Sequence, residues 1–398
     1  MPSIDEQQGI AVKGTPSEVA KLLAEIERDA DFFGQHATTN EVKGRLQPAV
    51  FEKLLDLGLI HAQVPASLGG FGLNALGTLR IIEALSRADA STGWVTMAMA
   101  FCTGAAAAYL SDAGAAKISA PGKHGLVAGA GAPTGVAKVV PGGYEVSGRW
   151  RYGSGVLHAE WVHAGVRVET NGAKGATASG TPSTRIAYLP VEQVQLLGNW
   201  DVIGLCATGS VDFAVNEVFV SQDLTVDAVK PQRQRGDMIF GHSLTLGTLI
   251  GHCAWAMGTT RRLLDELATF ARTGSLRSGS LADNHAFHEH FAEHEAALRA
   301  ARAFTYESWE RAQRMIDASE DFSTKDLTLI RLALAHVTNV ATRAASFAYK
   351  AAGGETLRQS PLQRMCRDIL AGGQHITSSP PVLQACGRVL AGLAPDER

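Results

Sequence analysis

The chain has no excess of positive charge: 36 Lys and Arg residues stand against 39 Asp and Glu, and the formal net charge is −3 over 398 residues. Binding to nucleic acid or to an anionic membrane surface requires basic residues that neutralise phosphate groups, so we expect neither kind of partner. No run of about twenty uncharged apolar residues appears, which argues against a membrane-spanning helix. Residues 1–14 lack a basic segment followed by an apolar run, so we expect no secretory signal.

Cysteine is scarce and scattered. The pattern contains no CxxC pair, and it predicts reduced, mostly buried thiols in a cytoplasmic protein. The remaining composition is that of an ordinary soluble chain, with 45% hydrophobic and 19% charged residues, which is enough apolar material to bury a large core. The five cysteines are Cys102, Cys206, Cys253, Cys366 and Cys386.

The spacing of apolar residues changes twice along the chain. From residue 16 to about 120 apolar residues recur at helical spacing, and from about 125 to 230 the period falls towards two, which is typical of strands. After about residue 236 the helical period returns and holds to the end. The sequence therefore predicts an N-terminal helical domain (1–124), a middle β domain (125–235) and a C-terminal helical bundle (236–398).

Three motifs suggest chemistries that the surrounding sequence does not support. The segment GAGAPTG (129–135) resembles a phosphate-cradling glycine loop, but such a loop needs a helix directly after it, and strand and turn residues follow here. YGSGV (152–156) does not supply the GxSxG turn of a Ser-His-Asp hydrolase. Within a histidine cluster at 285–294, His290 and His294 have a spacing that can bind a metal. No third ligand is fixed by the sequence, so we expect a solvated or interface surface and no metal.

The helix–β–helix order occurs together with four motifs: PASLGGFG, GRWRYGSG, WDVIGLCATGSVDFAVNEVFV and SPLQRMCRD. In this order and at these separations they resemble the acyl-CoA dehydrogenase fold over nearly the whole chain. The resemblance implies a mainly α protein with a middle β domain. In that fold an N-terminal helical domain, a β-barrel-like domain and a C-terminal four-helix bundle enclose a flavin. The fold alone does not decide the chemistry.

The carboxylate base of the acyl-CoA dehydrogenases is missing. That family uses a glutamate about two helical turns after the Arg-Asp pair, or one in the first helix of the bundle. Here the window RDILAGGQHITSS contains no acid after Asp368, and residues 243–258 contain none at all. General-base catalysis contributes about 10²–10⁴-fold to a rate, so we do not expect acyl-CoA dehydrogenase activity.

His375, in the same window, is similar instead to the histidine of flavin-dependent monooxygenases built on this fold, such as dibenzothiophene monooxygenase and p-hydroxyphenylacetate hydroxylase. Their pattern GRW-x-x-x-SG-x-x-HA-x-W is matched from Gly148 to Trp161. The resemblance implies an oxygenase component that takes reduced flavin (FMNH2 or FADH2) from a separate flavin reductase. With O2 it forms a C4a-(hydro)peroxyflavin that hydroxylates a small aromatic or heteroaromatic substrate.

The resemblance also implies a cytoplasmic homotetramer, in which a neighbouring subunit contributes to the flavin site. Other readings remain open. One is an N-oxygenase of an amine or amino sugar. Another is a flavin oxidase or acyl-CoA dehydrogenase relative, or a non-catalytic binding protein.

The resemblance assigns catalytic roles to two residues. His375 is expected to reach the C4a face of the flavin, as base for a substrate hydroxyl or as proton donor to the peroxide, because imidazole titrates near neutral pH. Ser154 is expected near the flavin N5–C4a edge. The alternatives are a helix-end histidine bonding the last carbonyls and a turn hydroxyl bonding the local backbone. Arg367 and Asp368 are expected to form a buried structural pair.

Further residues are expected to contact the flavin. Trp150 is expected beside the isoalloxazine or in the β core, and Gly372 would allow close approach. Trp94 would belong to an apolar wall, although a core stripe is the default for its helix. Several relatives carry another histidine in this helix, which is absent here, so a second catalytic imidazole is not expected. The expected cofactor-binding residues are Trp94, Gly131, Pro133, Thr134, Trp150, Ser154 and Gly372.

Overall fold

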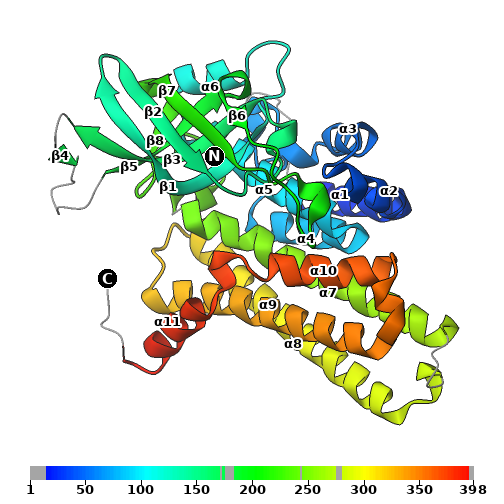
Figure 1. The fold of residues 1–398 in the computed structure, drawn as a ribbon. Coiled ribbons are helices and arrows are strands. Elements are labelled where there is room, and N and C mark those ends of the chain that lie inside the picture. The colour runs from blue at the N-terminus through cyan, green and yellow to red at the C-terminus, as the bar shows by residue number, and fades with distance from the viewer. Residues whose placement is uncertain (1–14, 171–172, 175–182, 243, 275–279, 394–398) are drawn as a thin grey trace.

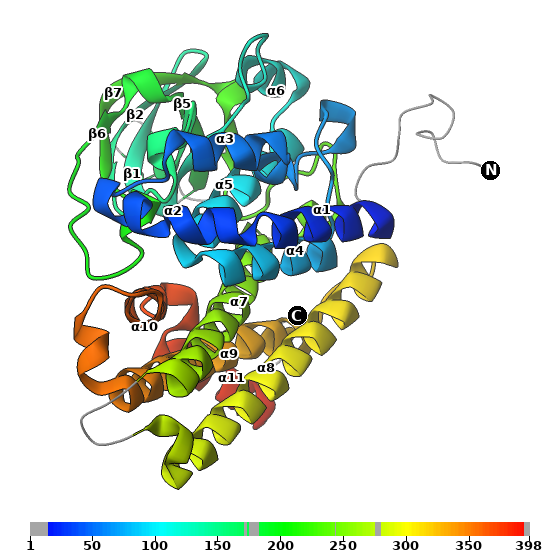
Figure 2. The same cartoon turned by 90° about the vertical axis from the view of Figure 1, so that its right-hand side faces the viewer.

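The computed structural model describes residues 15–170, 173–174, 183–242, 244–274 and 280–393. Helices come first, a sheet follows, and a second group of helices ends the chain (Figure 1). The sheet and the C-terminal helices lie at opposite ends of the molecule, with α4 and α5 between them (Figures 1 and 2). The first group comprises α1 (Pro16–Arg28), α2 (Ala30–Lys43), α3 (Pro48–Asp56), α4 (Ala75–Ala88), α5 (Ala90–Tyr109) and α6 (Asp112–Ile118).

Side-chain caps determine where the helices of the first group begin. Thr15 and Glu18 form a reciprocal capping box at the start of α1. Asp89 caps α5, because its Oδ2 accepts the Thr92 N–H at 2.8 Å. Helix α5 is apolar on nearly all sides and buried along most of its length, as expected for a helix enclosed by other elements. It therefore forms the centre of the molecule.

The sheet has the strand order β6-β7-β2-β1-β3-β5-β8, with β4 paired to β3. Strands β1 and β3 are parallel, and the other described pairs are antiparallel. The β1–β3 ladder changes register between Ala130 and Gly135, where residues 131–134 are exposed. The strands are β1 (Val127–Val140), β2 (Gly143–Trp150), β3 (Trp161–Thr170), β4 (Ala173–Lys174), β5 (Thr184–Pro190), β6 (Gln195–Leu196), β7 (Phe213–Ser221) and β8 (Thr225–Asp227).

Glycines allow the first helix of the C-terminal group to approach α5 closely. A Cβ atom at Gly251 would lie 2.9 Å from Cβ of Met97, and one at Gly247 would overlap the Phe101 ring. Met97 and Phe101 therefore belong to the core between α5 and α7. Figure 2 shows α7 between α4 and α9. The group comprises α7 (Leu244–Thr273), α8 (His285–Asp317), α9 (Thr324–Ala352), α10 (Pro361–Gly372) and α11 (Pro380–Leu390).

Within the described residues, no helix is long and apolar enough to cross a membrane. All five cysteines are free. Burial raises the pKa of the Cys102, Cys253 and Cys366 thiols to about 12, so these thiols are neutral at physiological pH.

The close packing of α7 on α5 predicts opposite effects for two glycine-to-alanine substitutions. Gly387→Ala, in the interior of α11 where a Cβ meets nothing within 4 Å, should stabilise the protein by up to about 1 kcal/mol through helix propensity. Gly251→Ala should destabilise it by about 1–2 kcal/mol, because the new methyl group crowds Met97. Urea denaturation of both variants measures the difference. Equal stabilisation by the two substitutions would contradict this account of the α5–α7 contact.

Candidate active site

Ser154 lies in the loop after β2, and the backbone of this loop adopts an uncommon conformation. Tyr152 and Gly155 have φ angles of 64° and 79°, in the left-handed region that favours glycine. A Cβ atom at Gly155 would lie 2.6 Å from Cγ of Met99, so glycine is required there. The Gly155 N–H donates to the Thr208 carbonyl at 3.2 Å. The loop is thereby joined to the segment that precedes β7.

A chain of hydroxyl groups runs from Trp94 through Ser154 into the protein. Trp94 Nε1–H donates to Ser154 Oγ at 3.0 Å, and Ser154 Oγ lies 2.7 Å from Ser210 Oγ. Ser210 Oγ lies 2.7 Å from Thr208 Oγ1, whose hydroxyl donates to the Leu205 carbonyl at 2.8 Å. A hydroxyl has one proton and a carbonyl has none, so each hydroxyl must donate towards Leu205. Ser154 therefore keeps a lone pair, rather than a proton, for a ligand.

The buried end of this chain depends on Asp368. Leu205 has a φ angle of 54°, which is uncommon for a residue other than glycine. Its N–H donates to Asp368 Oδ1 at 2.6 Å, and this contact holds the strained peptide in place. Burial raises the pKa of the Asp368 carboxyl to about 7. Among the described residues, Asp368 Oδ2 is buried and has no hydrogen-bond partner.

Arg367 and Asp368 were expected to form a buried pair, but each has other partners. Arg367 Nη2 lies 2.5 Å from Glu41 Oε1, and Nη1 donates to the Ile203 carbonyl at 2.6 Å. In the part of the chain that the structure describes, no ion pair joins Arg367 to Asp368. The arginine faces α2, whereas the aspartate faces the turn at Leu205.

His375 lies directly after α10 and caps the short helix that follows. Its Nδ1 accepts the Thr377 N–H at 3.4 Å and lies 2.7 Å from Thr377 Oγ1. The ring therefore bonds to residues after it, and no described bond joins it to the last carbonyls of α10. Because Nδ1 is an acceptor, the neutral ring carries its proton on Nε2.

His252, on α7, stacks on His375 and was missed by the sequence analysis. The two ring centroids lie 4.1 Å apart with an interplanar angle of 31°. His252 Nδ1 lies 2.9 Å from the Thr248 carbonyl, which can only accept, so this nitrogen carries the proton. Trp94 meets both rings edge-on, with centroid distances of 5.3 Å to His252 and 6.1 Å to His375.

Both imidazoles are neutral at physiological pH. Burial and the nearby His252 ring lower the pKa of His375 to about 3. Burial also lowers the pKa of His252, although the hydrogen bond to Thr248 opposes this shift. Neither ring is fully enclosed, because both side chains keep part of their surface exposed. Trp94, Ser154, His252 and His375 together form the candidate active site.

Comparisons with known proteins place this arrangement in a family. Models described as "Acyl-CoA dehydrogenase, N-terminal domain" and "Acyl-CoA dehydrogenase, C-terminal domain" match residues 20–119 and 250–380. The chain is 32% identical over 345 residues to an indole-3-acetate monooxygenase from Pseudomonas putida, with 85% of each chain covered. The chain belongs to the flavin-dependent monooxygenases of the acyl-CoA dehydrogenase fold.

Other relatives of this monooxygenase match over almost its whole length. It is 25% identical over 395 residues to the oxygenase component of an FADH(2)-dependent resorcinol hydroxylase from Rhizobium sp., covering 94% of this chain and 95% of the relative. XiaF from Streptomyces sp., solved in complex with FADH2 and glycerol, has a TM-score of 0.83 at 21% identity, with 95% and 98% of the chains covered. The HsaA monooxygenase from M. tuberculosis has a TM-score of 0.84 at 20% identity, with the same coverage. The two structural likenesses show the fold.

The structure shows the surroundings of Trp150 and Gly372, two residues of the monooxygenase that were expected to contact flavin. Trp150 is 1% exposed, its Nε1–H donates to the Gly165 carbonyl at 2.8 Å, and its ring stacks on Phe213. It therefore lies in the β core, which was the second of the two expected places. A Cβ atom at Gly372 would overlap the Trp255 ring. The space next to this glycine is thus filled by tryptophan, and flavin contact at Gly372 stays a prediction.

The expected flavin contacts at Gly131, Pro133 and Thr134 lie in the exposed bulge of β1. Pro133 has no N–H and cannot bind flavin through a backbone amide, and its carbonyl accepts from Arg167 Nη1 at 2.5 Å. Thr134 Oγ1 donates to the Arg149 carbonyl at 3.0 Å, near the end of β2. Binding of flavin by this bulge stays a prediction.

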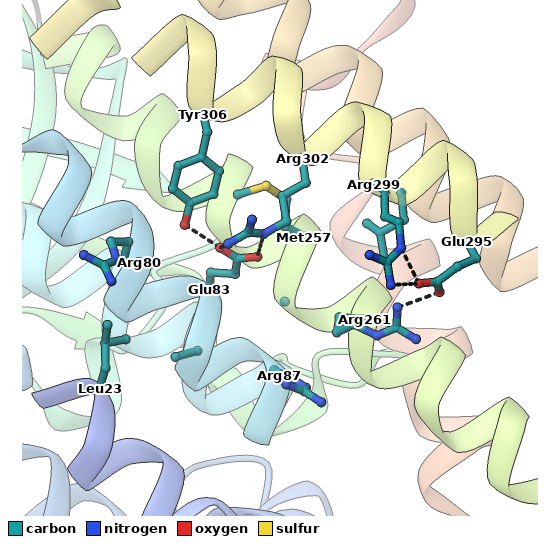
Figure 3. Close-up of a pocket in the computed structure, with 13 residues that line it drawn as sticks. Leu23, Arg80, Glu83, Arg87, Met257, Arg261, Glu295, Arg299, Arg302 and Tyr306 are labelled. Atoms are coloured by element: carbon teal, nitrogen blue, oxygen red, sulfur yellow. Dashed lines mark hydrogen bonds and ion pairs between the residues drawn. The ribbon is translucent and has the colours of Figure 1, made fainter. Parts of the chain in front are cut away.

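A cavity of about 470 Å³ lies elsewhere in the monooxygenase, between α4, α7 and α8 (Figure 3). The carboxylates that line this cavity already have partners within the protein. Glu83 accepts from Arg302 and Tyr306 at 2.6 Å each, and Glu295 pairs with Arg261 and with Arg299. The pairs at Glu83 join α8 to α4 of the N-terminal group, and the pair between Arg261 and Glu295 joins α7 to α8 within the C-terminal group.

The histidine cluster at 285–294 has other contacts. His290 Nδ1 lies 3.1 Å from Glu293 Oε2, and the His294 ring stacks on Phe347 at 4.6 Å. His288 Nε2 lies 2.9 Å from the Ala282 carbonyl. Over the described ranges, no group of three or more His, Cys, Asp or Glu residues could hold a metal ion.

The raised pKa of Asp368 predicts how stability depends on pH. A carboxyl with an ordinary pKa of 3.8 when unfolded and about 7 when folded binds its proton more tightly in the folded state. Its contribution to stability is therefore lost as pH rises from about 4 to 7. Asp368→Asn cannot ionise, so its stability relative to wild type should rise by on the order of 1–3 kcal/mol over that window.

Asp326→Asn is the matched control and should show the opposite trend. Burial opposes ionisation of Asp326, but hydrogen bonds from Ser323 and Arg311 outweigh it and lower the pKa of this carboxyl. Its contribution is present above the ordinary pKa and is lost as pH falls. Urea titrations of both variants at several pH values test the signs, and parallel curves for the two would refute this reading of Asp368.

Proposed function

We propose that the protein is the oxygenase component of a two-component system that hydroxylates a small aromatic or heteroaromatic substrate. The balanced reaction is reduced flavin + O2 + R–H → oxidised flavin + R–OH + H2O. The proposal rests chiefly on the neutral imidazole of His375, which faces Trp94 beside Ser154 where a dehydrogenase would need a carboxylate. Relatives named for indole-3-acetate and resorcinol favour an aromatic substrate.

The polarity of the hydroxyl chain fits reduced flavin. Reduced flavin, when bound, supplies the electrons that activate O2. Its N5 carries a hydrogen, whereas N5 of oxidised flavin is an acceptor. The Ser154 hydroxyl donates its hydrogen bond to Ser210 and accepts one from the Trp94 N–H, so towards N5 it offers a lone pair, which matches only the reduced form.

His375 can donate a hydrogen bond to the oxygen that is transferred to the substrate. Its Nε2–H faces away from Thr377 and can donate a hydrogen bond to an oxygen atom in the site. The Trp94 ring lies 6.1 Å from the His375 ring, nearly at right angles to it. This indole is apolar and would help to exclude water next to His375, which limits wasteful release of H2O2.

The proposed function implies a partner protein, and we also propose an oligomeric state. A separate flavin reductase supplies the cofactor, as the name "oxygenase component" of a relative indicates for that protein. We further propose a homotetramer, because Leu390 and Leu393 at the end of α11 are 45% and 68% exposed and a second subunit would cover them. The free thiols suit a cytoplasmic location.

Removal of His375 should uncouple the reaction. His375→Ala should bind reduced flavin and consume O2 as wild type does, because backbone contacts and apolar packing would still hold the flavin. Hydroxylated product should fall by on the order of 10²-fold or more, as expected when a hydrogen bond to developing charge is removed, while H2O2 rises towards the total O2 uptake. The assay supplies chemically reduced flavin and an indole substrate, and it measures both products, with His290→Ala as control. Wild-type product yield in His375→Ala would make the histidine a structural cap only.

The coupling efficiency of wild type should not follow an ordinary histidine titration. Since the pKa of His375 is about 3, the ring stays neutral from about pH 5.5 to 8, and the ratio of product to H2O2 should be flat there. A loss of coupling with a midpoint near pH 6.5 would show that His375 is not held neutral.

Thr208→Val should weaken the preference for reduced flavin. Without the Thr208 hydroxyl, Ser210 can turn its proton to Ser154, which can then donate to N5 of oxidised flavin. The ratio of the two dissociation constants should fall by about 3- to 10-fold in anaerobic and aerobic titrations. Thr305→Val is the matched control, because the Thr305 hydroxyl is buried and bonds its own helix at Ala301. An unchanged ratio in Thr208→Val would contradict the proposed polarity.

A further inference from the structure

We propose that His252 recognises the substrate: its Nε2 accepts a hydrogen bond from the ring N–H or phenolic O–H of the aromatic substrate. The inference rests on the proposed function in placing the substrate beside His375. It assigns a second imidazole to the site and restricts the substrate class to aromatic rings that carry a hydrogen-bond donor.

The hydrogen bond of His252 to its own helix determines which nitrogen is free. The Thr248 carbonyl accepts from Nδ1 at 2.9 Å, so Nδ1 carries the proton and Nε2 carries the lone pair. Nε2 lies on the edge of the ring opposite this bond, away from the α7 backbone. Within the described chain no hydrogen bond reaches Nε2, and the side chain is partly exposed.

His375 has the opposite arrangement. Its Nδ1 is held by Thr377, so its Nε2 carries a proton. The pair therefore offers one acceptor, on His252, and one donor, on His375. Substrate hydroxylation can use both: the donor can bond the oxygen being transferred, and the acceptor can bond the N–H or O–H of an electron-rich ring.

The stacked geometry keeps these two nitrogens available to a ligand. At a centroid distance of 4.1 Å and an angle of 31°, the rings lie close together but tilted, and no hydrogen bond joins them in the described structure. The Trp94 ring is steeply inclined to both imidazoles, with centroid distances of 5.3 Å to His252 and 6.1 Å to His375. Such apolar aromatic surfaces accommodate a flat aromatic ligand.

Neutrality limits what His252 does. Burial disfavours a charge on this imidazole and lowers its pKa, although the hydrogen bond to Thr248 opposes the shift. His252 therefore accepts a hydrogen bond and does not take up a full proton. It orients the substrate and discriminates against rings that have no donor, because such a ligand would cover this acceptor and leave it unpaired.

The test compares indole with benzofuran, in which a ring oxygen replaces the N–H at nearly the same shape. Isothermal titration calorimetry on the flavin-free, full-length chain measures the two dissociation constants. Wild type should bind indole about tenfold or more tightly than benzofuran. His252→Leu should bring the ratio close to one, and His252→Gln, whose amide carbonyl can accept the N–H, should restore part of it. His290→Leu, at an exposed position of α8, should keep the wild-type ratio.

Two results would overturn the proposal: a wild-type ratio retained in His252→Leu, or a His252→Gln variant that discriminates no better than His252→Leu. Turnover with reduced flavin and O2 separates this inference from the proposed function. If wild type discriminates as expected yet oxygenates neither compound nor any other aromatic ring, the proposed function fails while the role of His252 stands. If wild type oxygenates indole and the ratio does not respond at position 252, the reverse holds.

Discussion

The hydrogen bond from the Trp94 indole to Ser154 is the contact on which the candidate active site depends. Trp94 lies on α5, Ser154 follows β2, and the edge of the same indole meets His252 on α7 and His375 after α10. One side chain thus joins the three groups of elements. The position of Trp94 is fixed by its helix. Asp89 caps α5 five residues before Trp94, and glycines of α7 let α7 pack closely against α5. A shift of α5 would therefore displace the serine and both imidazoles together.

The direction of the hydroxyl chain is set at some energetic cost. Leu205 occupies the left-handed region, which costs on the order of 1–3 kcal/mol, and its N–H relies on a carboxyl that is almost completely buried. This strained conformation places the Leu205 carbonyl at the buried end of the chain, where it accepts the last hydrogen bond and sets the direction in which each hydroxyl donates. The same logic governs the histidines, since Thr248 and Thr377 select opposite tautomers of two stacked rings. Backbone groups far from any ligand thereby decide which atoms of the site donate and which accept.

The sequence predicted the fold and part of the site. Local periodicity is enough to locate α5, α7, β2 and β7, because helices and half-buried strands have different spacings. Motif spacing led to Ser154 and His375. His252 was missed although it is the only charged or imidazole side chain in residues 244–258, because its partner comes from the packing of α7 against a distant segment. Trp150 could not be placed either, since period-two alternation does not say which face of a strand meets the core until the register is known. The partner of Arg367, Glu41 on α2, depends likewise on packing between distant helices.

The central claim concerns proton positions, and neutron diffraction from a deuterium-exchanged crystal of the flavin-free protein measures them directly. We predict deuterium on Nδ1 of His252 and on Nε2 of His375, with the Ser154 hydroxyl directed at Ser210. Deuterium on Nδ1 of His375, or a Ser154 hydroxyl directed away from Ser210, would contradict the account.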